Sequence, residues 1–295
     1  MIWASNPVGH VVETNADQRV AMNHQNETQN PQISMEDATQ CLWVGYTDDF
    51  QDNLYEHVFE NVLTAEEKGK NKRYRHIRDQ RLHLMARWMC RTILSNYEPD
   101  VLPTEWEFQP NIHGKPEIIG PGTVQMPLHF NISHTEGVVV MAISKSGRVG
   151  VDVERFDRKM DLLGLSKRYF AEIEAEALEK CPETMQNELF YRIWTLKEAY
   201  VKAIGKGLAH ALDSFWFSPI DLEIGQPELY LQTQSGEAKL SDQWKAHVMR
   251  IGHLNQWIVS VVNEMTDFRE EGKNRCRIMR FTGIFQPSTG KTAFE

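Results

Sequence analysis

The sequence predicts an α+β fold in which antiparallel or mixed sheets pack against helices. Helical and strand-forming segments come in blocks along the chain and do not alternate as the β-α-β units of a parallel sheet would. Hydrophobic residues make up 41% of the 295 residues and charged residues 25%, which is typical of a globular protein with a substantial core. At about 150 residues per domain, this length fits two domains or lobes.

Charge and composition exclude several classes of protein. There are 32 Lys and Arg against 41 Asp and Glu, so the formal net charge is −9 and nucleic acid is not expected as a partner. No apolar run reaches the ~18–20 residues of a membrane helix, and the N-terminus lacks the pattern of a secretory signal. Four cysteines stand far apart without metal-ligand spacing: Cys41, Cys90, Cys181 and Cys276. We therefore expect a cytoplasmic protein with reduced thiols and no membrane partner.

Both ends of the chain are polar. Residues 1–38 contain too few apolar side chains to offset the entropy of ordering, which predicts a disordered N-terminal extension. Residues 266–295 form a second polar tail, in which a few apolar residues could dock locally, namely Ile278, Met279, Phe281, Ile284 and Phe285. The predicted folded body is therefore residues 39–265.

A long basic helix is predicted over residues 64–96. Thr64 and Glu67 form a capping-box pattern, and no proline interrupts the segment. Residues 66–91 contain nine basic and three acidic side chains, which gives a local charge of +6. The basic residues are Lys68, Lys70, Lys72, Arg73, Arg75, Arg78, Arg81, Arg87 and Arg91. This surface is either a solvated helix face or a binding surface for a multiply charged anion.

The remaining elements follow a Pro- and Gly-rich segment, residues 110–122, which we expect to be a loop. The apolar runs 138–143 and 149–154 predict the two strands of a hairpin. Helices are expected at 166–180 and 183–204, the second ended by Gly205 and Gly207, and antiparallel strands at 228–232, 244–251 and 256–263.

Two acidic residues on one strand suggest a metal site. Asp152 and Glu154 are two residues apart on the predicted strand and share one face, while Val151 and Val153 share the other. Two carboxylates this close repel each other unless a cation lies between them, and Mg²⁺ is held by one or two carboxylates together with substrate phosphates. The alternative is a solvent-facing strand that carries two acids by chance.

A second cluster lies on the helix predicted over residues 183–204. Glu198 and Lys202 are four residues apart and share one helix face. They form either a surface ion pair worth ~0.2–0.5 kcal/mol or a third metal carboxylate beside a phosphate-binding ammonium.

Three further candidates depend on local context. Ser133 and His134 offer hydroxyl and imidazole donors for phosphate oxygens, although a lone histidine is also common as a structural residue. A serine hydrolase is not predicted, because the chain has no Gly-x-Ser-x-Gly motif. Lys115 precedes Pro116 in a loop, and Glu174 is either a helix-surface acid or another carboxylate near the metal.

Taken in order, these motifs resemble those of the Sfp-type 4′-phosphopantetheinyl transferases. The specific part is the pair Gly-x-Asp-x-Glu and Trp-x-x-Lys-Glu-x-x-x-Lys. The resemblance covers residues 60–263 and rests on residues 114–116, 131–135, 150–154, 170–174 and 194–198. It implies two similar α/β lobes that form a pseudo-dimer, with an N-terminal lobe at residues 39–150 and a C-terminal lobe at residues 151–265.

The resemblance also implies a reaction. Members of this family move the phosphopantetheine arm of coenzyme A to a serine of an apo acyl or peptidyl carrier protein and release 3′,5′-ADP. Mg²⁺, with Mn²⁺ as a substitute, and coenzyme A bind between the lobes. Such enzymes serve fatty-acid, polyketide, polyunsaturated-fatty-acid or peptide synthases, and a monomer is expected.

By motif match, the resemblance assigns a role to each candidate residue. The Mg²⁺ ligands would be Asp152, Glu154 and Glu198, and the coenzyme A contacts would be Arg81, Lys115, Pro116, Ser133, His134 and Lys202. The catalytic set would be Asp152, Glu174, Glu198 and Lys202. Either Glu198 or Glu174 would serve as general base for the carrier serine, and the sequence leaves both open.

Two other classes of function remain open. A non-catalytic module that binds coenzyme A or a carrier protein would keep the basic helix and His134 but would not need three carboxylates. A Mg²⁺-dependent phosphohydrolase would release product without any carrier.

Overall fold

The computed structural model describes residues 40–121, 128–157, 160–207, 211–218, 227–232, 237–265 and 276–281. All of them belong to one unit, Asp37–Glu295. The extension predicted as disordered, residues 1–38, lies outside the described residues, as do residues 266–275 and 282–295 of the predicted tail. None of the described helices combines the length and apolar character that a membrane span requires.

The described residues of the first half of the chain form three helices and three strands of a sheet with the order β12-β1-β5-β4, in which β12 comes from the end of the chain. Its strands are β1 (Gln40–Tyr46), β4 (His129–Thr135) and β5 (Val138–Ser144), and its helices are α2 (Asp52–Asn61), α3 (Ala65–Lys72) and α4 (Ile77–Tyr97). The 3-10 turn η2 (Thr47–Asp49) follows β1, and β2 (Glu107–Pro110) pairs with β3 (Pro116–Gly120) in a separate hairpin.

The second half forms a sheet with the order β10-β11-β6 and a smaller sheet with the order β7-β8-β9. The first consists of β6 (Val149–Arg155), β10 (Trp244–Ile251) and β11 (Trp257–Glu264), and the second of β7 (Phe215–Ser218), β8 (Glu228–Gln232) and β9 (Ala238–Leu240). Its helices are α5 (Leu162–Tyr169), α6 (Glu172–Lys180), α7 (Glu183–Ile204) and the 3-10 turn η4 (Leu212–Ser214); β12 (Cys276–Arg280) then returns to the first sheet.

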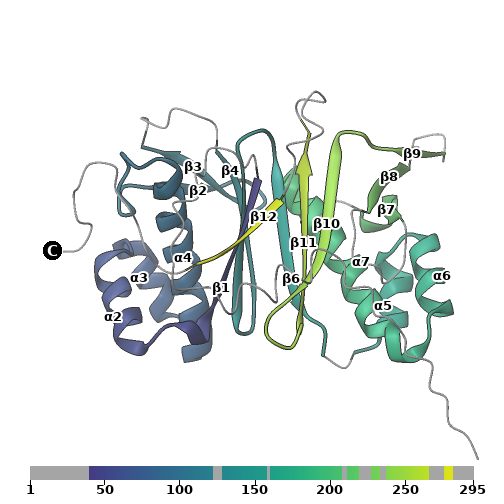
Figure 1. Cartoon of the computed structure of the whole chain (residues 1–295), viewed down its shortest axis with the longest axis horizontal. Coiled ribbons are helices and arrows are strands. Elements are labelled where there is room, and N and C mark those ends of the chain that lie inside the picture. The colour runs from purple at the N-terminus through teal and green to yellow at the C-terminus, as the bar shows by residue number, and fades with distance from the viewer. Residues whose placement is uncertain are drawn as a thin grey trace, which may run out of the picture. The chain divides into compact units, whose positions relative to one another are not determined.

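The two larger sheets lie between two layers of helices (Figure 1). Strand alternation explains this arrangement. On β11, Trp257, Val259 and Val261 join a buried cluster with β1 and β5 of the first sheet, whereas Ile258 and Val262 join the cluster beneath α7. The central layer is therefore an apolar contact between two sheets, and the predicted α+β fold class is confirmed. Residues 40–144 together with β12 are called the first lobe below, and residues 149–264 the second lobe.

The predicted hairpin of residues 138–143 and 149–154 is wrong, although both segments are strands. β5 pairs with β1 on one side and with β4 on the other, whereas β6 pairs with β11. Both edges of β5 are occupied, so the chain crosses from one sheet to the other between Ser144 and Val149. An apolar run reports that a strand is buried and does not report which strand it pairs with.

Two predicted helices are each divided in two. The basic helix expected over residues 64–96 is interrupted between α3 and α4, where Asn71 Nδ2 donates to the Gln80 carbonyl at 2.8 Å and Gln80 Nε2 donates to the Tyr74 carbonyl at 2.9 Å. These side-chain hydrogen bonds replace helical ones. The helix expected over residues 166–180 is likewise divided into α5 and α6.

Other elements agree more closely with the sequence pattern. α7 has the predicted bounds and ends at Gly205, which adopts the left-handed conformation with φ 71°. The strands expected at 228–232 and 244–251 are β8 and β10, and the strand expected at 256–263 is β11. The loop expected at 110–122 was too simple a prediction, because β3 and the end of β2 lie within it.

The C-terminal strand β12 docks on the first lobe. It runs parallel to β1, with Gln40 opposite Cys276 and Val44 opposite Arg280. The next residue, Phe281, is 3% exposed, and its ring centroid lies 5.0 Å from that of Trp88. The local docking predicted for the apolar residues of the tail is therefore confirmed at Phe281.

Phe281→Ala is expected to lower the free energy of unfolding by about 3–5 kcal/mol, because it leaves a cavity in place of a buried ring. Denaturant titration followed by tryptophan fluorescence measures this change. Ile278→Ala is the matched control on β12, since its side chain is 46% exposed, and it should cost no more than about 0.5 kcal/mol. Equal effects of the two substitutions would contradict an anchoring role for Phe281.

Candidate active site

Strand β6 presents two acidic residues to helix α7. Val151 and Val153 lie in the apolar layer between the sheets, so Asp152 and Glu154 point from the opposite face, as predicted. The register with β11 is regular through this segment, so no bulge reverses the alternation.

The backbone of helix α7 packs directly against the backbone of strand β6 at Gly150. A β-carbon added at Gly150 would lie 1.9 Å from the carbonyl oxygen of Ala199 and 2.5 Å from the nitrogen of Ala203. Only glycine permits such close packing of a helix on a strand. As a result, the last two turns of α7, which carry Glu198 and Lys202, lie directly beside Asp152.

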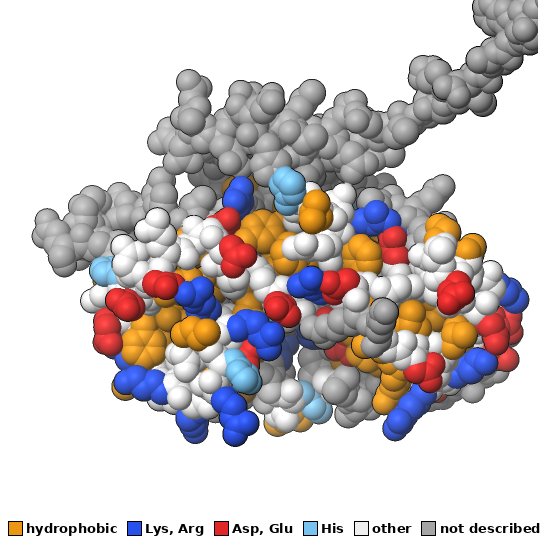
Figure 2. Space-filling view, turned by 90° about the horizontal axis from the view of Figure 1, so that it is seen from below, with side chains coloured by type: hydrophobic (Ala, Val, Ile, Leu, Met, Phe, Trp, Pro, Cys, Tyr) orange, Lys and Arg blue, Asp and Glu red, His pale blue; other side chains and the backbone are white. Residues whose placement is uncertain are grey.

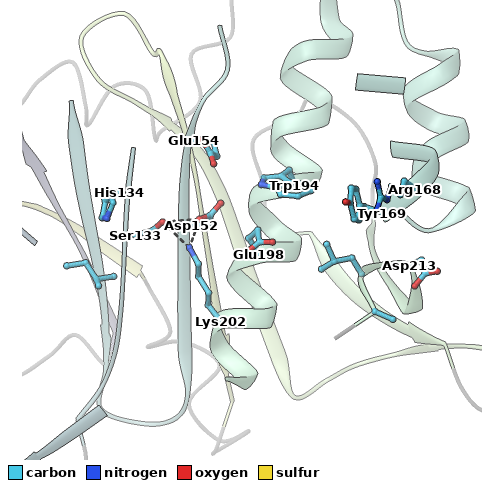
Figure 3. A pocket seen from close by; sticks show the side chains of 13 residues that line it. Ser133, His134, Asp152, Glu154, Arg168, Tyr169, Trp194, Glu198, Lys202 and Asp213 are labelled. Carbon is cyan, nitrogen blue, oxygen red and sulfur yellow. Dashed lines mark hydrogen bonds and ion pairs between the residues drawn. The ribbon is translucent and has the colours of Figure 1, made fainter. Parts of the chain in front are cut away.

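Three side chains from three elements form a hydrogen-bonded cluster at this contact (Figure 3). The Nζ atom of Lys202 lies 2.6 Å from Asp152 Oδ1 and donates to Ser133 Oγ at 3.0 Å. The Ser133 hydroxyl donates to the same Asp152 oxygen at 2.9 Å. Ser133 belongs to β4 of the first lobe, whereas Asp152 and Lys202 belong to the second lobe. The cluster therefore joins the two lobes.

The cluster forms one wall of a cavity of about 800 Å³. Glu154, Glu198 and His134 line the same cavity, so all three carboxylates predicted to bind a metal share one pocket. In Figure 3, Ser133, His134 and Lys202 lie toward one end, Glu198 lies in the middle, and the other end is formed by Arg168, Tyr169 and Asp213. The remaining lining residues are Ile132, Asp152, Trp194, Ala211 and Leu212.

Two of the carboxylates have oxygen atoms available for a cation. Asp152 Oδ2 and Glu198 Oε1 are buried, and neither has a hydrogen-bond partner within the described ranges. Burial raises the pKa of Glu198 and the charge of Asp152 raises it further, against the opposing effect of Lys202. A divalent cation would relieve this repulsion.

The same residues do not form a complete metal shell by themselves. In the part of the chain that the structure describes, no three Asp, Glu, His or Cys side chains converge as a ligand set. Mg²⁺ commonly takes one or two carboxylates and completes its shell with water and substrate phosphates. The site therefore fits a cation that is shared with a bound phosphate ligand.

His134 is the titratable donor at the polar end of the cavity. Its partly enclosed position lowers the pKa of the imidazole, and the nearby Lys202 ammonium lowers it further. Asp79 and Asp152 act in the opposite direction. The ring is therefore mainly neutral at pH 7, and an arriving anion would favour its protonation.

Glu174, the alternative general base, is fully buried and does not line this cavity. Its carboxylate accepts hydrogen bonds from the backbone N–H groups of Ala171 at 3.1 Å and Phe217 at 3.3 Å, and it pairs with Lys197 Nζ at 2.6 Å. Lys197 also donates to two backbone carbonyls of the segment 212–215, both at 2.6 Å. Glu174 therefore supports the wall of the cavity from behind.

Three residues predicted to bind coenzyme A are not among those that line the cavity. Arg81 pairs with Asp52, and its guanidinium lies 5.5 Å from the ring centre of Tyr55. Pro116 is the first residue of β3. The ammonium of Lys115 donates to backbone carbonyl groups.

The basic surface of α3 and α4 is smaller than its sequence charge suggests. Glu67 caps α3 and pairs with both Arg87 and Arg91 inside the first lobe. Lys68 pairs with Glu60. Figure 2 shows basic and acidic side chains interspersed on both halves of the visible face.

Sequence reasoning missed the aromatic side of the cavity. Trp194 lies one helical turn before Glu198, and the Tyr169 ring meets it edge-on with centroids 6.1 Å apart. The four-residue spacing of Trp194 and Glu198 on one helix face was a usable signal. Arg168 and Asp213 had none, because only the tertiary fold brings their segments to the cavity.

Comparison with known proteins finds two matching family models. Residues 148–262 match the model described as 4′-phosphopantetheinyl transferase superfamily, and residues 51–146 match the model described as 4′-phosphopantetheinyl transferase, N-terminal. The boundary between the two matches falls at the crossover between the sheets.

Individual relatives carry the same description. The 4′-phosphopantetheinyl transferase HetI of Nostoc sp. is 33% identical over 148 residues, which cover 50% of this chain and 62% of that protein. The 4′-phosphopantetheinyl transferase gsp of Aneurinibacillus migulanus is 32% identical over 185 residues (60% of this chain, 71% of that protein). Sfp of Bacillus subtilis is 32% identical over 159 residues (53% and 66%). The match thus spans less than two thirds of the Nostoc relative.

Gly150→Ala is expected to destabilise the protein by at least about 1–3 kcal/mol, because the added methyl group would overlap the backbone of α7. Gly69→Ala is the matched control: nothing lies within 4 Å of the added carbon, and alanine should stabilise α3 by about 0.5–1 kcal/mol. Thermal unfolding of both variants measures the difference. A Gly150→Ala variant as stable as the wild type would show that α7 does not rest on β6 in this way.

Proposed function

Because this chain belongs to the 4′-phosphopantetheinyl transferase family, we propose that it transfers the 4′-phosphopantetheine arm of coenzyme A to a serine hydroxyl of an apo acyl or peptidyl carrier protein. The observation that supports this most strongly is that one cavity is lined by residues of both lobes. These residues include carboxylates and hydrogen-bond donors for phosphate oxygens. Ser133 and His134 come from one lobe, and Asp152, Glu198 and Lys202 from the other.

Coenzyme A is an anion with a diphosphate and a 3′-phosphate, and the polar end of the cavity suits it. Lys202 contributes a fixed positive charge, and Ser133 and His134 contribute hydrogen-bond donors. When bound, Mg²⁺ would be held by Asp152 and Glu198 with Glu154 nearby, and it would neutralise charge on the diphosphate and on the departing 3′,5′-ADP.

The transfer step exchanges one phosphorus–oxygen bond for another. The serine oxygen of the carrier forms a bond to the phosphorus that bears the pantetheine arm, and the bond from that phosphorus to the bridging oxygen breaks. 3′,5′-ADP leaves with the bridging oxygen. The serine hydroxyl loses its proton as the new bond forms, so a base must lie within hydrogen-bond reach.

Glu198 is the better placed of the two candidate bases. It lies between the polar and aromatic ends of the cavity, where its carboxylate would accept the proton directly or through water. Glu174 has its carboxylate engaged by Lys197 and by two backbone N–H groups. We therefore propose that the carrier serine enters beside Glu198, with the pantetheine arm along Trp194 and Tyr169.

The carrier itself is a proposal at the level of its class. Acyl or peptidyl carrier domains of fatty-acid, polyketide, polyunsaturated-fatty-acid or peptide synthases all present the required serine. We propose that the protein acts as a monomer, since residues of one chain suffice to line the cavity. The cytoplasmic location is proposed from the reduced thiols that the sequence predicts.

Asp152→Asn is expected to lower the transfer rate by at least about a hundredfold, since it removes the charge that Lys202 and the cation share while keeping the size of the side chain. The gain in mass of an apo carrier incubated with coenzyme A and Mg²⁺ measures transfer. Circular dichroism of the same sample checks that the variant folds.

Three controls separate the alternative functions. Lys145→Met, at the turn between β5 and β6, should transfer normally. Omission of the carrier should leave coenzyme A intact, whereas its breakdown would indicate a phosphohydrolase. Coenzyme A binding by the wild type, without modification of any carrier tested, would favour a binding module.

Binding of coenzyme A is expected to be coupled to proton uptake by His134. The pKa of the free imidazole is lowered, so binding of an anion raises it, and affinity should increase as pH falls from about 8 to 6. Isothermal titration in two buffers of different ionisation enthalpy measures the protons exchanged. The 3′-phosphate of coenzyme A also titrates between about pH 8 and 6. The test is therefore the difference in protons taken up on binding between the wild type and His134→Gln. No difference would exclude this role of His134.

A further inference from the structure

The turn between β2 and β3 has a defined shape that directs Lys115 toward the second lobe. The side-chain oxygen of Asn111 accepts hydrogen bonds from the backbone N–H groups of His113 at 2.9 Å and Lys115 at 3.1 Å. The backbone N–H of Asn111 donates to the Lys115 carbonyl at 2.8 Å. Gly114 has a φ of +85°, in the left-handed region that glycine adopts more readily than other residues. The start of the Lys115 side chain is thereby fixed.

The Lys115 ammonium joins the end of a helix to the start of a strand. Its Nζ atom donates to the Lys202 carbonyl at 2.8 Å and to the Val149 carbonyl at 3.3 Å. Lys202 lies in the last turn of α7, where carbonyl groups lack helical partners and a cation is favoured by the helix dipole. Val149 is the first residue of β6.

These are the two elements that form the wall of the cavity. They touch at Gly150, next to Val149. Lys202 is thus held at both ends, through its carbonyl by Lys115 and through its ammonium by Asp152. Removing the first contact would leave the last turn of α7 free to shift while the side-chain contact remained.

We propose that Lys115 is a positioning residue: it fixes the last turns of α7 on β6 and thereby the direction of Glu198 and Lys202 in the cavity. The kinetic part of its test rests on the proposed transfer reaction, and the structural part does not. This role differs from the coenzyme A contact that the family resemblance implies for Lys115.

The electrostatics of Lys115 agree with this role. Burial lowers its pKa to about 8, against the opposing charge of Glu117, so the ammonium form still predominates at neutral pH. A charged donor to two backbone carbonyls is stronger than a neutral one.

The structural test is amide hydrogen exchange at the end of α7. Lys115→Met keeps the length of the side chain but removes its charge and donors, and exchange at Ile204 and Gly205 should accelerate about tenfold. Lys206→Met is the matched control, because this exposed lysine follows the same helix end, and exchange there should stay unchanged. Lys115→Arg, which keeps a charged donor, should restore most of the protection.

Unchanged exchange in a folded Lys115→Met variant would overturn the proposal. Should that variant not fold, Asn111→Ala replaces it, since it loosens the turn and leaves the ammonium in place. It should accelerate exchange at the same two amides by a smaller factor, and wild-type exchange there would overturn the proposal equally.

The kinetic test separates positioning from ligand binding. At saturating coenzyme A, Lys115→Met should lower kcat by about tenfold to a hundredfold, because a small displacement of catalytic groups is costly. The Kd values of coenzyme A and of 3′-dephospho-coenzyme A should change by the same small factor. A selective loss of affinity for coenzyme A would instead show that Lys115 binds the 3′-phosphate, which overturns the proposal. If the wild type transfers nothing to any carrier, the proposed function fails while the exchange result still judges Lys115.

Discussion

The site depends on one contact, the backbone-to-backbone approach of α7 to β6 at Gly150. Because this glycine has no side chain, the helix can lie close enough for residues on its inner face to reach the strand residues that follow. Asp152 comes two residues later on the same strand face, and Lys202 reaches it from the helix at 2.6 Å. A larger residue at position 150 would displace the helix and separate Asp152 from Lys202. The close packing of α7 on β6 therefore also determines the geometry of the site.

The same contact places two carboxylates close together, and a bound cation would reduce the repulsion between them. Asp152 and Glu198 line one cavity with buried oxygens, and the Lys202 ammonium opposes their negative charge. Burial raises the pKa of Glu198, and the neighbouring negative charge of Asp152 raises it further. A cation bound together with a phosphate group would change that balance: Asp152 and Glu198 would hold the cation, and Lys202 and Ser133 would be hydrogen-bond donors to the phosphate.

Local geometry determined what the sequence could predict. The shared face of Asp152 and Glu154 and the bounds of α7 follow from two- and four-residue periodicities, which do not depend on the rest of the fold. Pairing is a tertiary property, so two neighbouring apolar strands were wrongly joined in a hairpin. The same limit applies to charge: Glu67 neutralises two arginines of α4 that lie far from it in sequence. For Glu174 the sequence left open a helix-surface acid or a carboxylate near the metal, because its buried partner Lys197 is recognisable only in three dimensions.

Stacking of two sheets explains why the cavity needs both lobes. The second lobe alone would supply the carboxylates and Lys202, but it would lack the Ser133 hydroxyl that bonds to both Asp152 and Lys202. That hydroxyl is placed by β4, whose position depends on the apolar layer between the sheets. A substitution that changes side-chain volume in that layer, for example at Val259, would therefore shift Ser133 and His134 relative to Asp152. Neither Val151 nor Val259 lines the cavity, so it is the volume of these side chains that matters, through the relative placement of the two sheets.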